Sequence, residues 1–290
     1  MYNNAMKTAD PKKEEHIIMA KHRSSWTSRR YHKLLAEGRG QGTLENYKPW
    51  ITIHDIASKG VSSRILGYTT GRIHHTLSTL ETSFFYLLDA SDKVIDIREQ
   101  YPLLPVDETV SIADRTGIRH PRDQASRYPY VMTTDFVITT QEGIVARSVK
   151  QSEELENPRV LEKLEIERRY WERRHVKWRI VTEETIDHQK ARNLEWIYRA
   201  RFYPEMLPEG CDAQEIETFF ANLYHGTCLS VADVARQTEE RFELSPGLGI
   251  TTFQYMLLQH QIKIDLSSPL DLVSKRTGKG GAHSWLEMYV

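Results

Sequence analysis

Cysteine, long hydrophobic runs and net charge are all scarce in this sequence. Two cysteines in 290 residues, Cys211 and Cys228, can form neither a disulfide framework nor a four-ligand zinc site by themselves. No stretch approaches the roughly 18 apolar residues of a membrane-spanning helix, and residues 1–16 contain no apolar signal core. We therefore expect a cytoplasmic protein with free cysteines and no membrane association.

The charge that is present is unevenly distributed. The chain holds 39 basic and 40 acidic side chains, for a net charge of −1. Residues 1–186 carry 29 basic and 26 acidic side chains, whereas residues 187–290 carry 10 and 14. Residues 1–40 carry nine basic and four acidic side chains. A basic segment ahead of a folded core is typical of a protein that binds a polyanion, although a solvated, frayed tail would have the same composition.

Composition and periodicity divide the chain into three segments. Residues 1–35 form a basic arm that we expect to be partly disordered. Residues 36–186 alternate strand-like and helix-like stretches, which indicates an α/β core around a mixed sheet. The expected strands are 50–53, 64–68, 93–101, 130–139, 144–150 and 178–182, the expected helices are 74–89 and 157–174, and 102–128 are expected to be loops.

The third segment, residues 187–290, has a mostly helical pattern. Helices are expected at 195–201, 213–224, 230–242 and 251–261, followed by a strand at 262–266. This order is similar to a winged helix, a fold that often binds DNA. The segment is acidic, however, and the helix at 251–261 contains no Lys or Arg. Because phosphate contacts dominate DNA affinity, we expect this domain to bind a protein partner.

A hairpin in the core gathers chemically useful side chains. If residues 140–143 form the turn, Thr139 faces Ile144 and Asp135 faces Ser148. Side chains alternate between the two faces of a strand, so Asp135, Ser148 and Lys150 share one face. Cross-strand neighbours lie about 5–8 Å apart. The arrangement places a carboxylate beside an ammonium, which by itself is also what a simple cross-strand ion pair would give.

A second carboxylate lies on the apolar face of the helix expected at 74–89. Glu81 follows the same helical spacing as Leu77, Phe84 and Leu88. A carboxylate that faces a core is costly unless a cation pairs with it. Lys150 or a metal ion could be that partner, or Glu81 could lie at the edge of the apolar stripe.

Together, Glu81, Asp135 and Lys150 fit metal-assisted phosphodiester hydrolysis. Carboxylate oxygens are the ligands that Mg²⁺ prefers, and a bound cation polarises the phosphoryl oxygen and activates water. A lysine can stabilise the negative charge that develops. The spacing is a degenerate form of the PD-(D/E)xK nuclease pattern.

Several longer segments carry a more specific signal. In chain order, these segments are 37–42 (EGRGQG), 47–50 (YKPW), 70–75 (TGRIHH), 80–81 (LE), 96–103 (DIREQYPL), 132–136 (MTTDF) and 161–171 (LEKLEIERRYW). Through them, the chain resembles the TnsA family of transposon endonucleases over residues 35–200.

The resemblance implies a restriction-endonuclease-like domain at 36–186 followed by a winged-helix-like domain at 187–290. It implies cleavage of the 5′ strands at transposon ends, with one or two Mg²⁺ ions that Mn²⁺ can replace. The implied partners are duplex DNA, a TnsB-like DDE transposase and a TnsC-like ATPase regulator bound through 187–290, in the bacterial cytoplasm at the nucleoid. The implied catalytic residues are Glu81, Asp135 and Lys150, the same three that the pattern selects, with Glu81 and Asp135 as metal ligands.

The sequence departs from the family two residues before the lysine. A Glu, Asp or Gln is usual there, and this chain has Ser148. A hydroxyl is a poorer metal ligand than a carboxylate. We therefore expect a weaker contact at this position, either through a water held by Ser148 or through the backbone carbonyl of Val149.

Other polar residues are candidates for DNA contact or for further ligation. Arg39, Arg72, His74 and His75 are expected to contact DNA, and the two histidines could instead form a metal-binding pair. Glu99 could be a third carboxylate near the metal or part of a structural ion pair. Two alternative functions remain open, a stand-alone restriction or repair nuclease and a non-catalytic adaptor with a nuclease fold.

Overall fold

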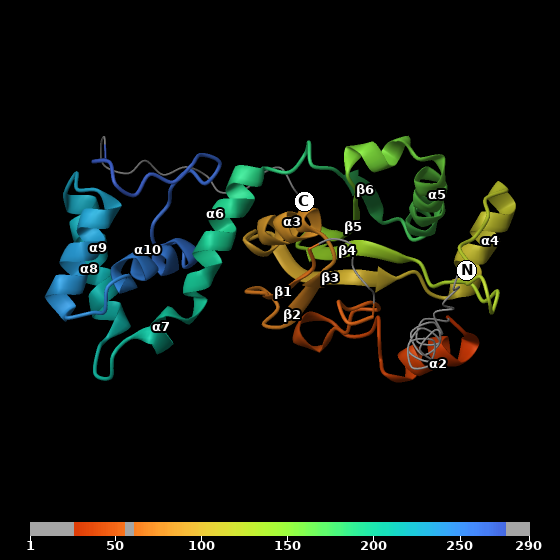
Figure 1. Ribbon diagram of the computed structural model, residues 1–290, viewed down its shortest axis with the longest axis horizontal. Coiled ribbons are helices and arrows are strands. Elements are labelled where there is room, and N and C mark those ends of the chain that lie inside the picture. Colours follow the sequence, from red (N-terminus) through yellow and green to blue (C-terminus); the bar gives the residue numbers. More distant parts are fainter. Residues whose placement is uncertain (1–25, 56–60, 277–290) are drawn as a thin grey trace, which may run out of the picture.

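A computed structural model describes residues 26–55 and 61–276. Figure 1 shows a sheet flanked by helices at one end of the molecule, a cluster of helices at the other, and α6 between them. Most of the expected basic arm, residues 1–25, lies outside the described ranges. No helix in these ranges is long and apolar enough to cross a membrane.

The main sheet has four strands and mixed direction, as predicted. Its strands are β3 (Val94–Pro102), β4 (Thr133–Thr140), β5 (Gly143–Val149) and β6 (Lys177–Val181), hydrogen-bonded in that order. The first three form an antiparallel meander. The fourth runs parallel to β5, because α5 (Pro158–Glu172) carries the chain back across the sheet between them.

Helices cover both faces of this sheet. On one face, α3 (Thr79–Asp89) places Phe84 against Phe136 of β4, with ring centroids 5.6 Å apart. On the other face, Val137 of β4 packs in a buried cluster with residues of α4 (Val106–Thr116) and α5. Neighbouring residues 136 and 137 therefore serve opposite cores, as strand alternation requires.

The segment before α3 corrects part of the sequence-based expectation. Residues expected to begin a helix at 74 form the strand β2 (Ile73–Thr76), which pairs with β1 (Ser63–Leu66). The helix begins only at Thr79, because the Ser78 side chain caps it by accepting a hydrogen bond from the Glu81 amide. The strand expected at 50–53 is not formed.

The segment 102–128, which was expected to be a loop because of its prolines, contains the helix α4. Pro105 supplies the extended residue ahead of α4, and Gly117 ends the helix in the left-handed conformation at φ 69°. Proline is compatible with a helix start because the first amide of a helix has no intrahelical partner. The prolines therefore mark the boundaries of this helix.

The C-terminal part is helical wherever it has regular structure. Its helices are α6 (His188–Tyr198), α7 (Tyr203–Met206), α8 (Ala213–Gly226), α9 (Val231–Phe242) and α10 (Leu248–Leu258); α2 (Ser28–Ala36) precedes the sheet, and short 3-10 helices occur at 44–46, 152–156 and 199–202. The strand expected at 262–266 is not formed; Ile262 and Leu266 instead bury their side chains in the core as irregular chain. No strand occurs in the part of 187–290 that the structure describes, so a winged-helix-like fold is not confirmed.

One continuous core joins the sheet and the C-terminal helices. Buried residues of α3 and β4 belong to the same hydrophobic cluster as those of α6, α8, α9 and α10. Tyr86 of α3 meets Tyr198 of α6 edge to face, with ring centroids 5.1 Å apart. The two parts of the chain are thus packed directly on each other.

Candidate active site

Lys150 and Asp135 form an ion pair where β4 and β5 separate. The predicted register is confirmed, since Thr139 faces Ile144 and the last paired residues are Phe136 and Arg147. Beyond that point Asp135 Oδ2 accepts the amide of Val149 at 2.7 Å and the Lys150 Nζ at 2.9 Å. The carboxylate therefore occupies the gap between the diverging strands.

Lys150 is held as a cation by several carboxylates. Burial alone would lower its pKa, but the charge and hydrogen bond of Asp135, and the charges of Glu167 and Glu81, raise it above the usual value. Its Nζ also donates to the Val149 carbonyl at 2.7 Å. The carbonyl proposed as a metal ligand is thus engaged by the lysine.

Glu81 lies at the first turn of α3 and is only 7% exposed. Its carboxylate accepts hydrogen bonds from the Leu77 amide at 2.9 Å and the Ser78 hydroxyl at 3.1 Å. Burial and then the nearby charge of Asp135 raise the pKa of Glu81 to about 7. The mutual repulsion shows that Glu81 and Asp135 share one electrostatic environment, although they come from different elements.

Glu167 is a third carboxylate at this site, and the sequence analysis missed it. It comes from α5, and its Oε1 accepts hydrogen bonds from the Thr134 hydroxyl at 2.6 Å, the Trp178 indole at 3.0 Å and the Ser148 hydroxyl. Burial and then the charge of Asp135 raise the pKa of Glu167 to about 7. Ser148 therefore holds a carboxylate in place of supplying one.

The signal that identified Glu81 was also present for Glu167. Leu164, Glu167 and Trp171 follow steps of three and four along α5, and all three are buried. A carboxylate on an apolar helix face is costly without partners, so this spacing could have revealed it. A cavity of about 290 Å³ opens beside it, and Asp135, Lys150 and Thr133 also line that cavity.

Gln100 connects two of these elements. Its Nε2 donates to Glu81 Oε2 at 3.4 Å, and its Oε1 accepts from the Thr133 hydroxyl at 3.3 Å. The side chain is buried, and the backbone has φ 48°, a left-handed conformation that is uncommon for residues other than glycine. The pairs on either side of it place Gln100 across from Asp135. Such strain often persists at functional sites.

Two residues expected to bind DNA are instead part of a buried ion cluster. Arg72 donates to both carboxylate oxygens of Glu99, at 2.8 and 2.5 Å, and His74 Nδ1 lies 2.8 Å from Glu99 Oε2. Glu99 and His74 are fully buried and Arg72 is 8% exposed. None of the three can reach a DNA surface, which corrects the expectation for Arg72 and His74. The cluster also identifies Glu99 as a structural ion-pair partner.

Arg39 and His75 lie outside the Asp135 cavity. Arg39 Nη1 bonds Asp55 at 2.5 Å and the Trp50 carbonyl at 3.2 Å, so its charge is already matched. The His75 ring is half-buried, and burial lowers its pKa. Its amide donates to Glu99 Oε1 at 3.1 Å. A DNA contact by Arg39 or His75 stays a prediction.

The donor set suits a divalent cation that also coordinates water and substrate. Within the described ranges, no three or more His, Cys, Asp or Glu side chains are grouped closely enough to enclose a metal ion. Mg²⁺ does not require such an enclosure, because one or two carboxylates plus waters and phosphate oxygens commonly hold it. Asp135 and Glu81 supply hard carboxylate oxygens whose repulsion a dication would relieve, so the residues fit.

Both halves of the chain match known protein families. Residues 91–183 match the family described as TnsA-like endonuclease N terminal, and residues 185–266 match TnsA endonuclease C terminal. The chain is also 42% identical over 186 residues to the Tn7 transposition protein TnsA of Escherichia coli, a match that covers 63% of this chain and 67% of that protein. The first matched region contains Asp135, Lys150 and Glu167, and Glu81 precedes it.

Proposed function

Because this chain belongs to the TnsA family of transposition endonucleases, we propose that it is the subunit that cleaves the 5′ strands at transposon ends with a divalent cation, Mg²⁺ in the cell. The observation that supports this most is the Lys150–Asp135 ion pair at the point where β4 and β5 separate. Two more buried carboxylates, Glu81 and Glu167, interact electrostatically with Asp135. The pairing of a lysine with clustered carboxylates is what phosphodiester hydrolysis requires.

Each residue has a distinct role in this proposal. Asp135 and Glu81 would hold the cation, which supplies Lewis-acid activation of the phosphate and of water. Lys150 stays protonated and donates hydrogen bonds to the scissile phosphate or to the attacking water. Glu167, whose Oε1 accepts hydrogen bonds from three side chains, adds a third carboxylate to the site and interacts electrostatically with Asp135. Gln100 holds the Glu81 carboxylate by a hydrogen bond from β3.

The proposal includes two protein partners. A TnsB-like DDE transposase would process the complementary 3′ strands, and a TnsC-like ATPase would contact the helical domain at 187–290. The acidic balance of that segment supports a protein contact, as does α10, which has no Lys or Arg. Duplex DNA would be bound mainly by the sheet domain.

Strand-resolved mapping of cuts at transposon ends tests the proposal. The full chain is incubated with Mg²⁺ and end-labelled DNA, with and without the transposase and ATPase partners. Cuts confined to the 5′ strands, dependent on Lys150, are expected only in the assembled complex. Sequence-independent nicking by the chain alone would instead identify a stand-alone nuclease.

A non-catalytic adaptor is the second candidate, favoured by Ser148 and by the absence of an enclosed metal cluster among the described residues. Calorimetric titration with Mn²⁺ distinguishes the two. The endonuclease is expected to release or take up heat on binding Mn²⁺, and to lose that signal in Asp135→Asn. An adaptor would bind its partners normally and show no Mn²⁺ signal.

Glu167→Gln is expected to lower cleavage by about ten- to hundredfold. Glutamine keeps a carbonyl oxygen for the Thr134, Ser148 and Trp178 donors, so the fold should be retained while the negative charge is lost. Single-turnover cleavage rates measure the effect. Glu172→Gln removes an exposed charge from the same helix and should change little; an equal loss in both variants would contradict a role at the site.

Gln100→Asn is expected to lower the cleavage rate by about tenfold while leaving thermal stability nearly unchanged. Asparagine tolerates positive φ well and keeps the amide, but it is too short to reach Glu81. A fall in kcat with little change in KM would indicate lost positioning. Gln141→Asn, at the exposed hairpin turn, provides the control.

A further inference from the structure

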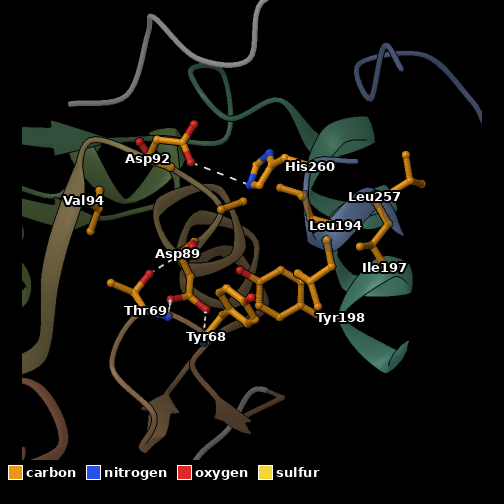
Figure 2. Close-up of a pocket in the computed structure, with 13 residues that line it drawn as sticks. Tyr68, Thr69, Asp89, Asp92, Val94, Leu194, Ile197, Tyr198, Leu257 and His260 are labelled. Carbon is orange, nitrogen blue, oxygen red and sulfur yellow. Dashed lines mark hydrogen bonds and ion pairs between the residues drawn. The ribbon is translucent and has the colours of Figure 1, made fainter. Parts of the chain in front are cut away.

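A second cavity lies where α3, α6 and α10 meet, and its lining shares no residue with the Asp135 cavity. Its volume is about 360 Å³, near the lower end of the about 300–1,000 Å³ typical of ligand pockets. We call it the junction pocket (Figure 2). Its lining residues that matter here are Tyr68, Asp89, Ser91, Asp92, Tyr198 and His260.

A buried carboxylate forms part of the pocket wall. Asp89 is 4% exposed and accepts the amides of Tyr68 and Thr69 at 2.7 and 2.9 Å. Within the described ranges it has no ion-pair partner. A carboxylate can accept about four hydrogen bonds, so it retains capacity for further donors. A buried charge that lacks a cation favours a cationic ligand.

Two buried hydroxyls also line the pocket, and one of them lacks a hydrogen-bond partner. Ser91 Oγ makes no hydrogen bond within the described part of the chain, and its residue is 4% exposed. The hydroxyl of Tyr198, a residue 2% exposed, interacts with the Asp89 carboxylate. Figure 2 shows Tyr198 beside Asp89, and burial and this neighbour raise the pKa of Tyr198 well above its usual value. Unsatisfied buried polar groups are rare in folded proteins, and the Ser91 hydroxyl is one that lines this cavity.

The remaining walls are apolar, and the rim is acidic. Leu194, Ile197 and Leu257 contribute buried aliphatic surface. At the rim, Asp92 Oδ1 lies 3.7 Å from His260 Nε2. A matching ligand therefore has an aliphatic stem and a cationic head with several donors.

We propose that the junction pocket binds an arginine side chain of a partner protein. Guanidinium carries five N–H donors in a rigid fork and is less strongly hydrated than an ammonium, so it can satisfy the carboxylate and both hydroxyls at once. That the occupant belongs to a protein rests on the proposed function, in which the chain acts with protein partners. The pocket holds one side chain, and Tyr68 at its mouth is 51% exposed, leaving aromatic surface for the adjoining backbone.

Binding of a short peptide to the full-length protein tests this proposal. The probe is the capped tripeptide acetyl-Gly-Arg-Gly-amide, titrated at low salt and followed by NMR. We expect millimolar affinity for this peptide, and at least about tenfold weaker binding of the citrulline analogue, which has the same shape without the charge. Free L-arginine is expected to bind more weakly than the peptide because its own carboxylate is repelled by Asp89 and Asp92.

Two substitutions test whether the peptide binds in the junction pocket. Ser91→Val fills the pocket and removes an unpartnered buried hydroxyl, so peptide binding should fall at least about tenfold while the melting temperature is maintained or raised. Asp89→Asn should weaken binding similarly. Ser267→Val, at an exposed position, is the control and should leave affinity unchanged.

The outcomes separate this proposal from the proposed function. Equal binding of the arginine and citrulline peptides, or unchanged affinity in a folded Ser91→Val protein, would overturn the arginine pocket. Free L-arginine binding as tightly as the peptide would show a small-molecule site instead. Peptide binding is measured without DNA or metal, so a failure of strand cleavage leaves this result standing, and the reverse also holds.

Discussion

Asp135→Asn is expected to lower 5′-strand cleavage by at least about a thousandfold while the protein remains folded. Asparagine keeps an oxygen that can accept the Val149 amide, so the separation of β4 and β5 is preserved. The negative charge that pairs with Lys150 and that would hold the cation is lost. Single-turnover cleavage of labelled transposon ends measures the rate.

A charge-matched control makes this result interpretable. Asp107→Asn removes an equal charge from the exposed first turn of α4 and should leave cleavage within about twofold. Circular dichroism and the melting temperature establish that both variants fold. Cleavage at the normal rate by a folded Asp135→Asn protein would remove Asp135 from the active site.

Glu99→Gln is expected to cost about 3–5 kcal/mol of unfolding free energy, the largest stability effect that we predict. The substitution leaves Arg72 buried without its counter-charge and replaces one of the two carboxylate oxygens, so that either His74 or the His75 amide loses its acceptor. At about 2–4 °C per kcal/mol for a chain of this size, the melting temperature should fall by roughly 10 °C. Calorimetry measures both quantities.

The pH dependence of the unfolding free energy tests the buried cluster of Glu99, Arg72 and His74 in a second way. Burial would raise the pKa of Glu99, but His74 and Arg72 outweigh it and hold the pKa at about 2. Because the folded pKa is depressed, the stabilisation is complete above the ordinary value of 4.5 and is lost as the pH falls toward 2. Glu99→Gln should flatten this acid limb. Glu162→Gln, in a partly exposed pair with Arg159, should cost less than about 1 kcal/mol; a similar cost in both variants would contradict the role of burial.

Strand pairing in the core could be predicted because a single local feature determines it. The turn at 140–143 sets the register of β4 and β5, and the alternation of apolar side chains sets which face is buried. Both are encoded in a few consecutive residues, so the pairing of Asp135 with Lys150 follows from the order of residues in one hairpin. Pro158, at the first position of α5, likewise marked that helix start.

The features that the sequence analysis missed depend on contacts between segments that are distant in the chain. His74 lies in a strand because Glu99 of β3 holds it, which no periodicity around residue 74 can show. Glu167 reaches the site because α5 crosses back over the sheet, and Ser148 makes sense only with that helix in place. The chain at 262–266 has strand-like composition, but its buried side chains pack against helices. Tertiary packing decided each of these cases.

Helix α3 packs against both the sheet and the C-terminal helices. It carries Glu81 in its first turn, contacts α6 through Tyr86, and contributes Asp89, its last residue, to the wall of the junction pocket. Because close-packed interiors transmit strain, a shift of α6 is expected to move α3 with it. If Glu81 holds the cation as proposed, a displacement of about 1 Å there would cost about a hundredfold in rate. Under the proposed function, a protein that binds the helical part would therefore change the rate of DNA cleavage without contacting the DNA.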